Sequence, residues 1–402
     1  MTTISTCPLD ILEAILASFT NREVELADDI EEPDRHPFFV DRARICPRHS
    51  LTPLARVCRR FKSIATNLIW EYIVIETPSR LDQVCARLGA DPSLQEKVRR
   101  LDIQLPGGRH MQSIIDGLVL FPGLKILHIA NRGNMKDWDE RRGALCETIV
   151  ERLPGLRRLQ FKGSKETLTV GDFERLSIGL GSLKTLQVFA LGPMKWVERP
   201  EGCWVAIIAE PMTDTPIVFP KLESLSVGHN VSFRGAGAGV HVLQRLAYPT
   251  SLPNIRRLDT MQKHRQSRLL IAAHEERLGH ASLDGGSVNE ATSFSACPSI
   301  TVAISGPDTR LPLNIRNINL VAANDKVKAE WIRPVLERLD TVTYDMLDTI
   351  RLCFNESILS SFNPGELATY AQSRNIAIDV VPSPVPYVPT TDDEMTEVED
   401  SD

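Results

Sequence analysis

Two stretches of the chain carry residue types that could do chemistry at a suggestive spacing. His274-Glu-Glu-Arg-Leu278 begins like the helix of a zinc protease, but Leu278 stands where the second metal-binding histidine should be. Ser232–Val240 contains alternating glycines like a dinucleotide-binding loop, yet Val240 stands where the third glycine belongs. We interpret this second stretch as a flexible loop. Neither pattern predicts a catalytic centre.

Cysteine and histidine residues near the N-terminus could supply zinc ligands. Cys46 and His49 are close in sequence, with His36 and Cys7 upstream, but the spacing matches no common zinc module. The chain contains neither the GxSxG pattern of a serine nucleophile nor the glycine-rich sequence of a phosphate loop. We therefore expect a protein that is not an enzyme and that uses no metal or cofactor.

The bulk composition excludes several other classes. The 402 residues are 42% hydrophobic and 24% charged, which is typical of two to three globular domains. The net charge of -6 argues against nucleic acid as a partner. The eight cysteines form no CxxC pair, and neither a signal peptide nor a membrane-spanning run is recognisable. We expect a cytoplasmic or nuclear protein without membrane contact.

A sequence frame, apolar-Pro-x-apolar-x-x-Leu-x-apolar, recurs through the middle of the chain. Its last positions, as in Leu127-His-Ile129, alternate like a half-buried strand. Helix-like stretches lie between the copies, for example Trp138 to Leu153 and Asp172 to Leu180. The clearest copies begin at Phe121, Leu153, Leu180, Phe219 and Leu252, and fainter ones at Val98, Cys297 and Ile315.

One strand and one helix per unit predict an α/β fold, a curved solenoid with a parallel sheet. The frame leucines Leu127, Leu159, Leu186, Leu225 and Leu258 are 32, 27, 39 and 33 residues apart. The pattern resembles leucine-rich repeats, although its units are longer and the usual asparagine is mostly missing; Asn131 and Asn230 are the nearest candidates. We expect residues 262 to 296 to interrupt the array as an inserted helix and loop.

The strand positions between the apolar ones should face outward from the helices. Repeat proteins often bind their partners through this face of the sheet or through the loops at its edge. The candidate substrate-binding residues are therefore His128, Gln160, Gln187 and Ser226.

Two helices are predicted near the N-terminus. Leu54 to Leu68 has an apolar stripe at helical spacing, and Thr52-Pro53 suits its first turn. Pro8 opens an earlier helix with apolar residues on two sides: Leu9, Leu12, Leu16 and Phe19 on one, Ile11 and Ile15 on the other. Apolar residues on two sides imply two partners, one being the core of the domain itself.

These helices carry a family resemblance. CPLDILEAIL resembles the opening of an F-box, and LARVCRRFKSIATNLIW resembles its second half. With the repeats, the chain resembles F-box proteins with leucine-rich repeats, of the fungal type. The resemblance implies that the helices bind the Skp-family linker protein of a cullin-based ubiquitin ligase. The implied linker-binding residues are Pro8, Leu9, Ile11, Leu12, Ile15, Leu16, Leu54, Val57, Cys58, Phe61 and Trp70.

The resulting domain organisation has three parts. Residues 1–78 form an F-box-like helical module with a polar insertion at 21–50, and residues 79–381 form the repeats. Residues 382–402 form a Pro-rich and acidic tail that we expect to be disordered. The implied partners are the linker, the cullin scaffold and an unidentified protein substrate. Two alternatives stay open: a repeat-based interaction scaffold with no ligase link, and N-terminal helices that only cap the solenoid.

Overall fold

The computed structural model describes most of the chain outside the N-terminal insertion and the C-terminal tail. The described residues are 8–18, 26, 51–105, 109–131, 137–162, 167–188, 190–191, 195–198, 204–207, 216–227, 237–260, 265–285, 288, 294–304, 306–322, 327–341, 346–354, 356–361, 363–374 and 376–382. The four residues considered above as zinc ligands lie outside these ranges, as does most of the tail.

Twelve strands form an open parallel sheet whose order follows the chain, β1-β2-β3-β4-β6-β10-β11-β12-β13-β14-β15-β16. This confirms the predicted α/β class and the parallel sheet. The strands are β1 (Tyr72–Ile75), β2 (Arg100–Leu105), β3 (Ile126–Asn131), β4 (Arg158–Lys162), β6 (Thr185–Val188), β10 (Ser224–Val227), β11 (Arg257–Thr260), β12 (His280–Asp284), β13 (Ser299–Ile304), β14 (Asn317–Ala322), β15 (Thr349–Phe354) and β16 (Ala377–Pro382).

Helices lie between most successive strands, but the described residues contain none between β6 and β10, β12 and β13, or β13 and β14, so the expected helix in every unit is only partly present. The helices are α5 (Pro78–Ala90), α6 (Pro92–Gln95), α7 (Met111–Leu118), α8 (Trp138–Arg152), α9 (Val170–Gly179), α10 (Gly237–Leu246), α11 (Arg265–His274), η4 (Glu275–Arg277), α12 (Ala329–Thr341), α13 (Glu356–Leu359) and α14 (Pro364–Arg374). Two small pairs stand outside the main sheet, β5 (Thr167–Leu168) with β7 (Ala190–Leu191), and β8 (Lys195–Glu198) with β9 (Trp204–Ile207). The predicted helices near 138–153 and 172–180 are confirmed as α8 and α9.

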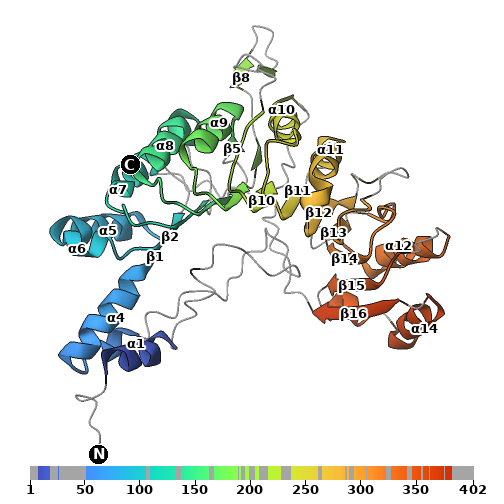
Figure 1. The fold of residues 1–402 in the computed structure, drawn as a ribbon, viewed down its shortest axis with the longest axis horizontal. Helices are drawn as coiled ribbons and strands as arrows, with labels where there is room; N and C mark the ends of the chain where they lie inside the picture. The colour runs from blue at the N-terminus through green and yellow to red at the C-terminus, as the bar shows by residue number, and fades with distance from the viewer. Residues whose placement is uncertain are drawn as a thin grey trace, which may run out of the picture. The chain divides into compact units, whose positions relative to one another are not determined.

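The chain divides into two compact units, the first reaching Ala281 and the second beginning at Ser282. In the first unit the helices from α5 to α10 lie along one side of the strands (Figure 1). In the second unit, β13 to β16 pair in parallel with their apolar residues in register, such as Ile300, Ile318 and Ile350.

The frame leucines form the centre of the first unit. Leu127 pairs in register with Leu159, Leu159 with Leu186, Leu186 with Leu225, and Leu225 with Leu258. All five are fully buried between the sheet and the helices. The five segments predicted to be neighbouring strands are therefore confirmed. Burying a side chain of this size stabilises a protein by about 2 kcal/mol, so the repeated leucine supplies each unit with its core.

The expected interruption at 262–296 is only partly present. Helix α11 lies there, but so does a regular strand, β12. The N–H groups of Gly279 and His280 donate to the Arg256 carbonyl, as those of Arg256 and Arg257 donate to Glu223. By this equivalence, buried Ala281 stands in the place of the frame leucine. The repeat therefore continues through this segment. The frame requires leucine where Ala281 stands, so this copy was not recognised in the sequence.

The N-terminal helices are α1 (Leu9–Ala17), α3 (Leu51–Leu54) and α4 (Arg59–Glu71). The prediction of a single helix over residues 54–68 is therefore wrong. Helix α3 ends at Leu54, and α4 begins only at Arg59. Cys58 has an extended backbone, and its carbonyl accepts the first bond of α4 from Lys62 N–H at 2.8 Å. The predicted stripe belongs mainly to α4, whose Phe61, Ala65 and Leu68 are buried.

Helix α4 passes directly into β1, since Glu71 and Tyr72 are consecutive. The first strand of the sheet thus lies within the range 1–78 assigned to the helical module. In the described part of the chain, no helix has both the length and the apolar content needed to cross a membrane.

Candidate functional site

The N-terminal helices form a module with its own small core. Leu12 and Leu16 of α1 and Leu51 of α3 pack against α4, which contributes Phe61, Ile64, Ala65 and Leu68. Figure 1 shows α1 lying against α4. Residues on either side of the polar insertion therefore meet in space, which is tolerable because the cost of closing a loop grows slowly with its length.

Four large apolar side chains of this module point into solvent. Leu9, Ile11 and Ile15 of α1 are 54%, 47% and 47% exposed, and Val57, in the break before α4, is 59% exposed. We call these four residues the apolar docking surface. The sequence placed Leu9 on the same side of α1 as Leu12 and Leu16; those two are buried, whereas Leu9, in the first turn of the helix, is exposed. Ile11 and Ile15 are four residues apart and so share one face of α1, and exposed apolar side chains on one face mark an interaction surface.

The other residues implied by the F-box resemblance divide into two groups. Leu12, Leu16 and Phe61 are buried in the core of the module, so their role is to hold the helices together. Pro8 and Cys58 are exposed beside the docking surface, and Leu54 and Trp70 are half-buried. Only part of the predicted set is thus accessible to a partner.

A second candidate site lies on the sheet of the first unit. His128, Gln160, Gln187 and Ser226 occupy one register row, which continues to Asp102 and Asp259 at its ends. The four predicted side chains are only 7%, 2%, 0% and 4% exposed, in the order given. The prediction that these residues occupy equivalent strand positions is confirmed. Their side chains, however, form a buried polar row and not an open face.

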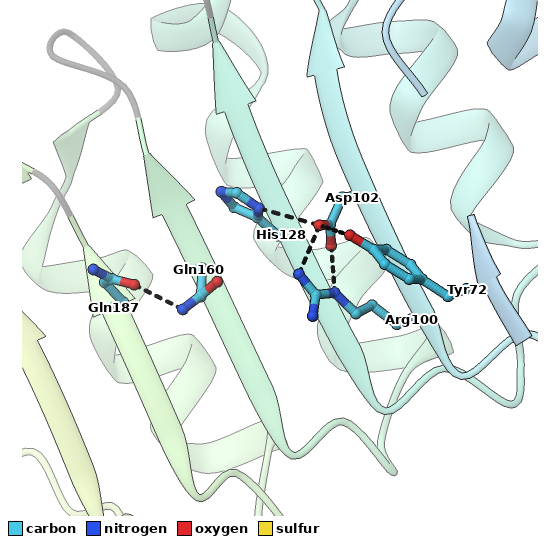
Figure 2. A network of polar contacts seen from close by, with 6 residues as sticks. All are labelled: Tyr72, Arg100, Asp102, His128, Gln160 and Gln187. Carbon is cyan, nitrogen blue, oxygen red and sulfur yellow. Dashed lines mark hydrogen bonds and ion pairs between the residues drawn. The ribbon is translucent and has the colours of Figure 1, made fainter. Parts of the chain in front are cut away.

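The polar row is anchored by a buried carboxylate (Figure 2). Arg100 donates from Nε and Nη2 to the two oxygens of Asp102, at 2.9 and 2.8 Å. The Tyr72 hydroxyl donates to Asp102 Oδ2 at 2.7 Å, and His128 Nδ1 lies 3.7 Å from the same oxygen. The guanidinium of Arg100 also stacks 4.4 Å from the centre of the Tyr72 ring. The cluster thereby links β1, β2 and β3.

Asp102 remains ionised in this setting. Burial alone would raise its pKa, but the adjacent Arg100 charge, the hydrogen bonds from Arg100 and the nearby His128 ring hold the pKa well below its usual range. A carboxylate with these partners is a structural anion. General acid or base work at neutral pH would require a pKa closer to the working pH.

The other side chains of the polar row also contact one another or a neighbouring arginine. The side-chain amides of Gln160 and Gln187 lie 2.7 Å apart, as Figure 2 also shows, and with the Gln160 amide turned over its oxygen accepts from Arg158 Nε and Nη2 at 3.1 and 2.9 Å. At the far end, the Ser226 hydroxyl and Arg257 Nε each donate to Asp259 Oδ2 at 2.9 Å. Arg-x-Asp therefore forms an ion pair within the strand in both β2 and β11. This repeated pair was not recognised in the sequence, although in both copies the arginine and the aspartate flank the frame leucine, Leu101 or Leu258.

The histidine of the zinc-protease-like stretch has a structural setting. His274 is buried at the end of α11, and its Nε2 lies 2.8 Å from the carbonyl of Leu246 in α10. Burial lowers the pKa of the His274 ring. Among the described residues, no group of three or more histidine, cysteine or acidic residues is arranged to hold a metal ion.

A scan against protein-family models and a search of the curated proteins gave no match to this chain.

Proposed function

We propose that this protein is a substrate-recognition adaptor of a Skp–cullin–F-box ubiquitin ligase, acting in the cytoplasm or nucleus. The helical module docks the Skp-family linker, and the linker connects it to the cullin scaffold. The repeats hold a protein target. The adaptor itself makes or breaks no bond, and it works by keeping the target close to the ligase's ubiquitin carrier.

The observation that carries this proposal is the apolar docking surface. The module already buries Leu12 and Leu16 in its own core, yet leaves Ile11 and Ile15 of the same helix in solvent. Exposing such residues has a cost in solubility that a permanent or frequent partner removes. Residues resembling the F-box motif thus supply both the core that holds the module together and the surface it presents.

One observation favours a second candidate, a repeat-based interaction scaffold with no ligase link. Helix α4 continues into β1, the end strand of the sheet, and Arg99 N–H donates to the Glu71 carbonyl at the helix end. Helices in that position also cap a solenoid, which repeat proteins need for solubility. In that case the N-terminal helices would serve only as a cap and would bind no linker.

Capture of the linker by the full chain separates the two functions. We expect Ile11→Asp combined with Ile15→Asp to abolish co-purification, because each change places an unpaired charge in an apolar contact. At about 1.4 kcal/mol per tenfold change in affinity, capture should fall by more than about tenfold. Leu12 is unsuitable for this test because it is 3% exposed and its replacement would disrupt the core of the module.

The matched control makes the same chemical change elsewhere. Ile178 of α9 and Leu269 of α11 are 86% and 46% exposed, so Ile178→Asp with Leu269→Asp should leave capture at the wild-type level. Circular dichroism would verify that both variants fold. Wild-type capture by a folded Ile11→Asp, Ile15→Asp variant would refute the adaptor function and leave the capped scaffold.

A further inference from the structure

A row of basic residues crosses the first unit at the positions just before the strands. The backbone N–H of Lys125 donates to the Arg99 carbonyl at 2.8 Å, and that of Arg157 to the Lys125 carbonyl at 2.8 Å. The N–H of Lys184 donates to the Arg157 carbonyl at 2.7 Å. The four residues thus occupy the same position in successive units, directly before β2, β3, β4 and β6. We call Arg99, Lys125, Arg157 and Lys184 the basic edge.

Two of these side chains lie against the turn that precedes the next strand. Arg99 Nη1 donates to the Gly123 carbonyl at 3.3 Å. Lys125 Nζ lies beside Gly155, where a Cβ atom would come within 2.7 Å of it. Both glycines follow the frame proline, so each turn leaves space for a cation from the preceding unit. The spacing of the charges is therefore set by the strands, at about 4.8 Å, and the row spans about 14 Å.

The charge of this edge is opposite to that of the whole chain. The described segments that precede these strands, at 92–99, 119–125, 153–157 and 180–184, contain Lys97 and the four basic-edge residues but only one acidic residue, Glu96. Arg99 and Arg157 are exposed, and Lys125 and Lys184 are half-buried. The row ends at Glu223, which pairs with Lys184 at 3.4 Å. Because the whole chain has a net charge of -6, this stripe is a local positive patch on an acidic protein.

We infer that the basic edge binds an extended acidic segment of a partner protein. Alternate side chains of an extended peptide lie on one side about 6.6 Å apart, so two or three carboxylates fit the length of the row. The buried polar row offers no such contact, because its aspartates are already paired with arginines of the same strands. The loops at the sheet edge are the remaining place where many units converge.

A peptide suits this edge better than nucleic acid. Proteins that hold duplex DNA neutralise about six to ten phosphates, and a four-residue row cannot do so. The acidic character of the whole chain also repels a long polyanion, whereas a short peptide experiences mainly the local stripe, within a Debye length of about 8 Å. Identifying the acidic segment with a ubiquitination target rests on the adaptor function proposed above. The peptide site itself does not.

Fluorescence anisotropy with the full chain tests the site. The probe is a labelled synthetic peptide of alternating glutamate and serine, with a glutamine–serine peptide as the neutral comparison. We expect the glutamate peptide to bind, the glutamine peptide not to bind, and affinity to fall as salt rises. Lys125→Glu with Arg157→Glu should weaken binding by more than about tenfold, and the corresponding double change to Gln should weaken it less.

The control reverses two charges elsewhere: Arg80→Glu in α5 with Arg109→Glu beyond β2, both at exposed positions. This variant has the same net charge as the first and should bind the glutamate peptide like the wild type. Equal binding by the Lys125→Glu, Arg157→Glu variant and the wild type overturns the inference. So does tighter binding of single-stranded oligothymidylate than of the peptide.

The linker distinguishes this inference from the proposed function. The Lys125→Glu, Arg157→Glu variant should still co-purify with the Skp-family linker, because the apolar docking surface is unchanged. Loss of peptide binding with the linker retained supports both proposals. Peptide binding by a wild-type chain that captures no linker supports the basic edge and refutes the adaptor.

Discussion

Asp102 illustrates how single residues stabilise this sheet. It is fully buried, yet its two oxygens receive hydrogen bonds from Arg100 and from Tyr72, which belong to different strands. A buried ion pair adds little net stability compared with an apolar pair, but breaking it by removing one partner is costly. The arrangement therefore makes the neighbouring strands dependent on one carboxylate.

We predict that Asp102→Asn lowers the free energy of unfolding by about 3 kcal/mol at neutral pH, because Arg100 is left without its counter-charge. The pKa of Asp102 is lower in the folded chain than in the unfolded chain. Its contribution is thus fully present above the unfolded pKa of about 3.9 and is lost as the pH falls below it. Urea unfolding of both proteins at neutral and acidic pH measures the difference, which should narrow in acid.

Tyr72→Phe serves as the comparison for that measurement. It removes one hydrogen bond to the carboxylate and leaves the ion pair, so we expect a loss of about 1.5 kcal/mol. A difference between wild type and Asp102→Asn that widened in acid would contradict the assigned role of the carboxylate.

At the scale of elements, the distance between α8 and α9 depends on a glycine. A Cβ atom on Gly179 would come within 2.0 Å of Val150 Cγ1 and 2.8 Å of Val150 Cβ. Because the second atom cannot move by side-chain rotation, the helix backbones would have to separate. The final residue of α9 therefore sets how closely consecutive helices pack on the sheet.

We predict that Gly179→Ala destabilises the protein by about 2 kcal/mol through overpacking. Combining it with Val150→Ala should recover part of the loss, since the clashing methyl groups are removed. Gly181→Ala is the control, because no atom lies within 4 Å of a Cβ at that position. Thermal melting of the four proteins decides the matter: equal destabilisation by Gly179→Ala and Gly181→Ala would show that packing is not the cause.

The sequence predicted strands better than it predicted helix ends. The frame leucines identified neighbouring strands because a buried apolar position recurs at the same place in every unit. The break at Val57 and Cys58 was missed because the apolar stripe continues through it without a change of period. Strand β12 could have been found from Leu278-x-x-Ala281-x-Leu283, if alanine had been accepted at the leucine position.

The candidate sites were predictable only by residue type. Alternation along each strand identified His128, Gln160 and Gln187 as a common row, and the structure places them in one register. Their burial could not be predicted, because alternation along a strand shows only that these polar side chains lie on the opposite side from the frame leucines. Two apolar sides of α1 were expected, one for the core and one for a partner, but which residues would be exposed depended on the packing of α1 on α4.

At the scale of the molecule, the two compact units allow stability to be changed locally. Repeats contact mainly their neighbours, so a defect in one unit weakens that unit first. Leu352 in β15 is fully buried and pairs with Leu320 and Val380 of adjacent strands. By the turn hydrogen bonds, Leu352 corresponds to Val188 and Val227 of the first unit, two residues after the frame leucine.

We predict that Leu352→Ala costs about 3 kcal/mol locally by leaving a cavity. Amide hydrogen exchange should accelerate in β13 to β16 and stay unchanged in β2 to β4. Linker capture, if the adaptor function is correct, should also be unchanged. Equal acceleration in both sets of strands would indicate that the whole chain unfolds as one cooperative body.

The longest unit has a practical consequence for engineering. Leu186 and Leu225 are separated by 39 residues that include β8 and β9, yet they pair in the same register as leucines 27 residues apart. The turn sets this register: the Lys184 carbonyl accepts from Glu223 and Ser224, as the Arg157 carbonyl does from Lys184 and Thr185. Strand alignment is thus independent of connection length. Foreign sequence grafted between β6 and β10 would meet no constraint from the strands that flank it.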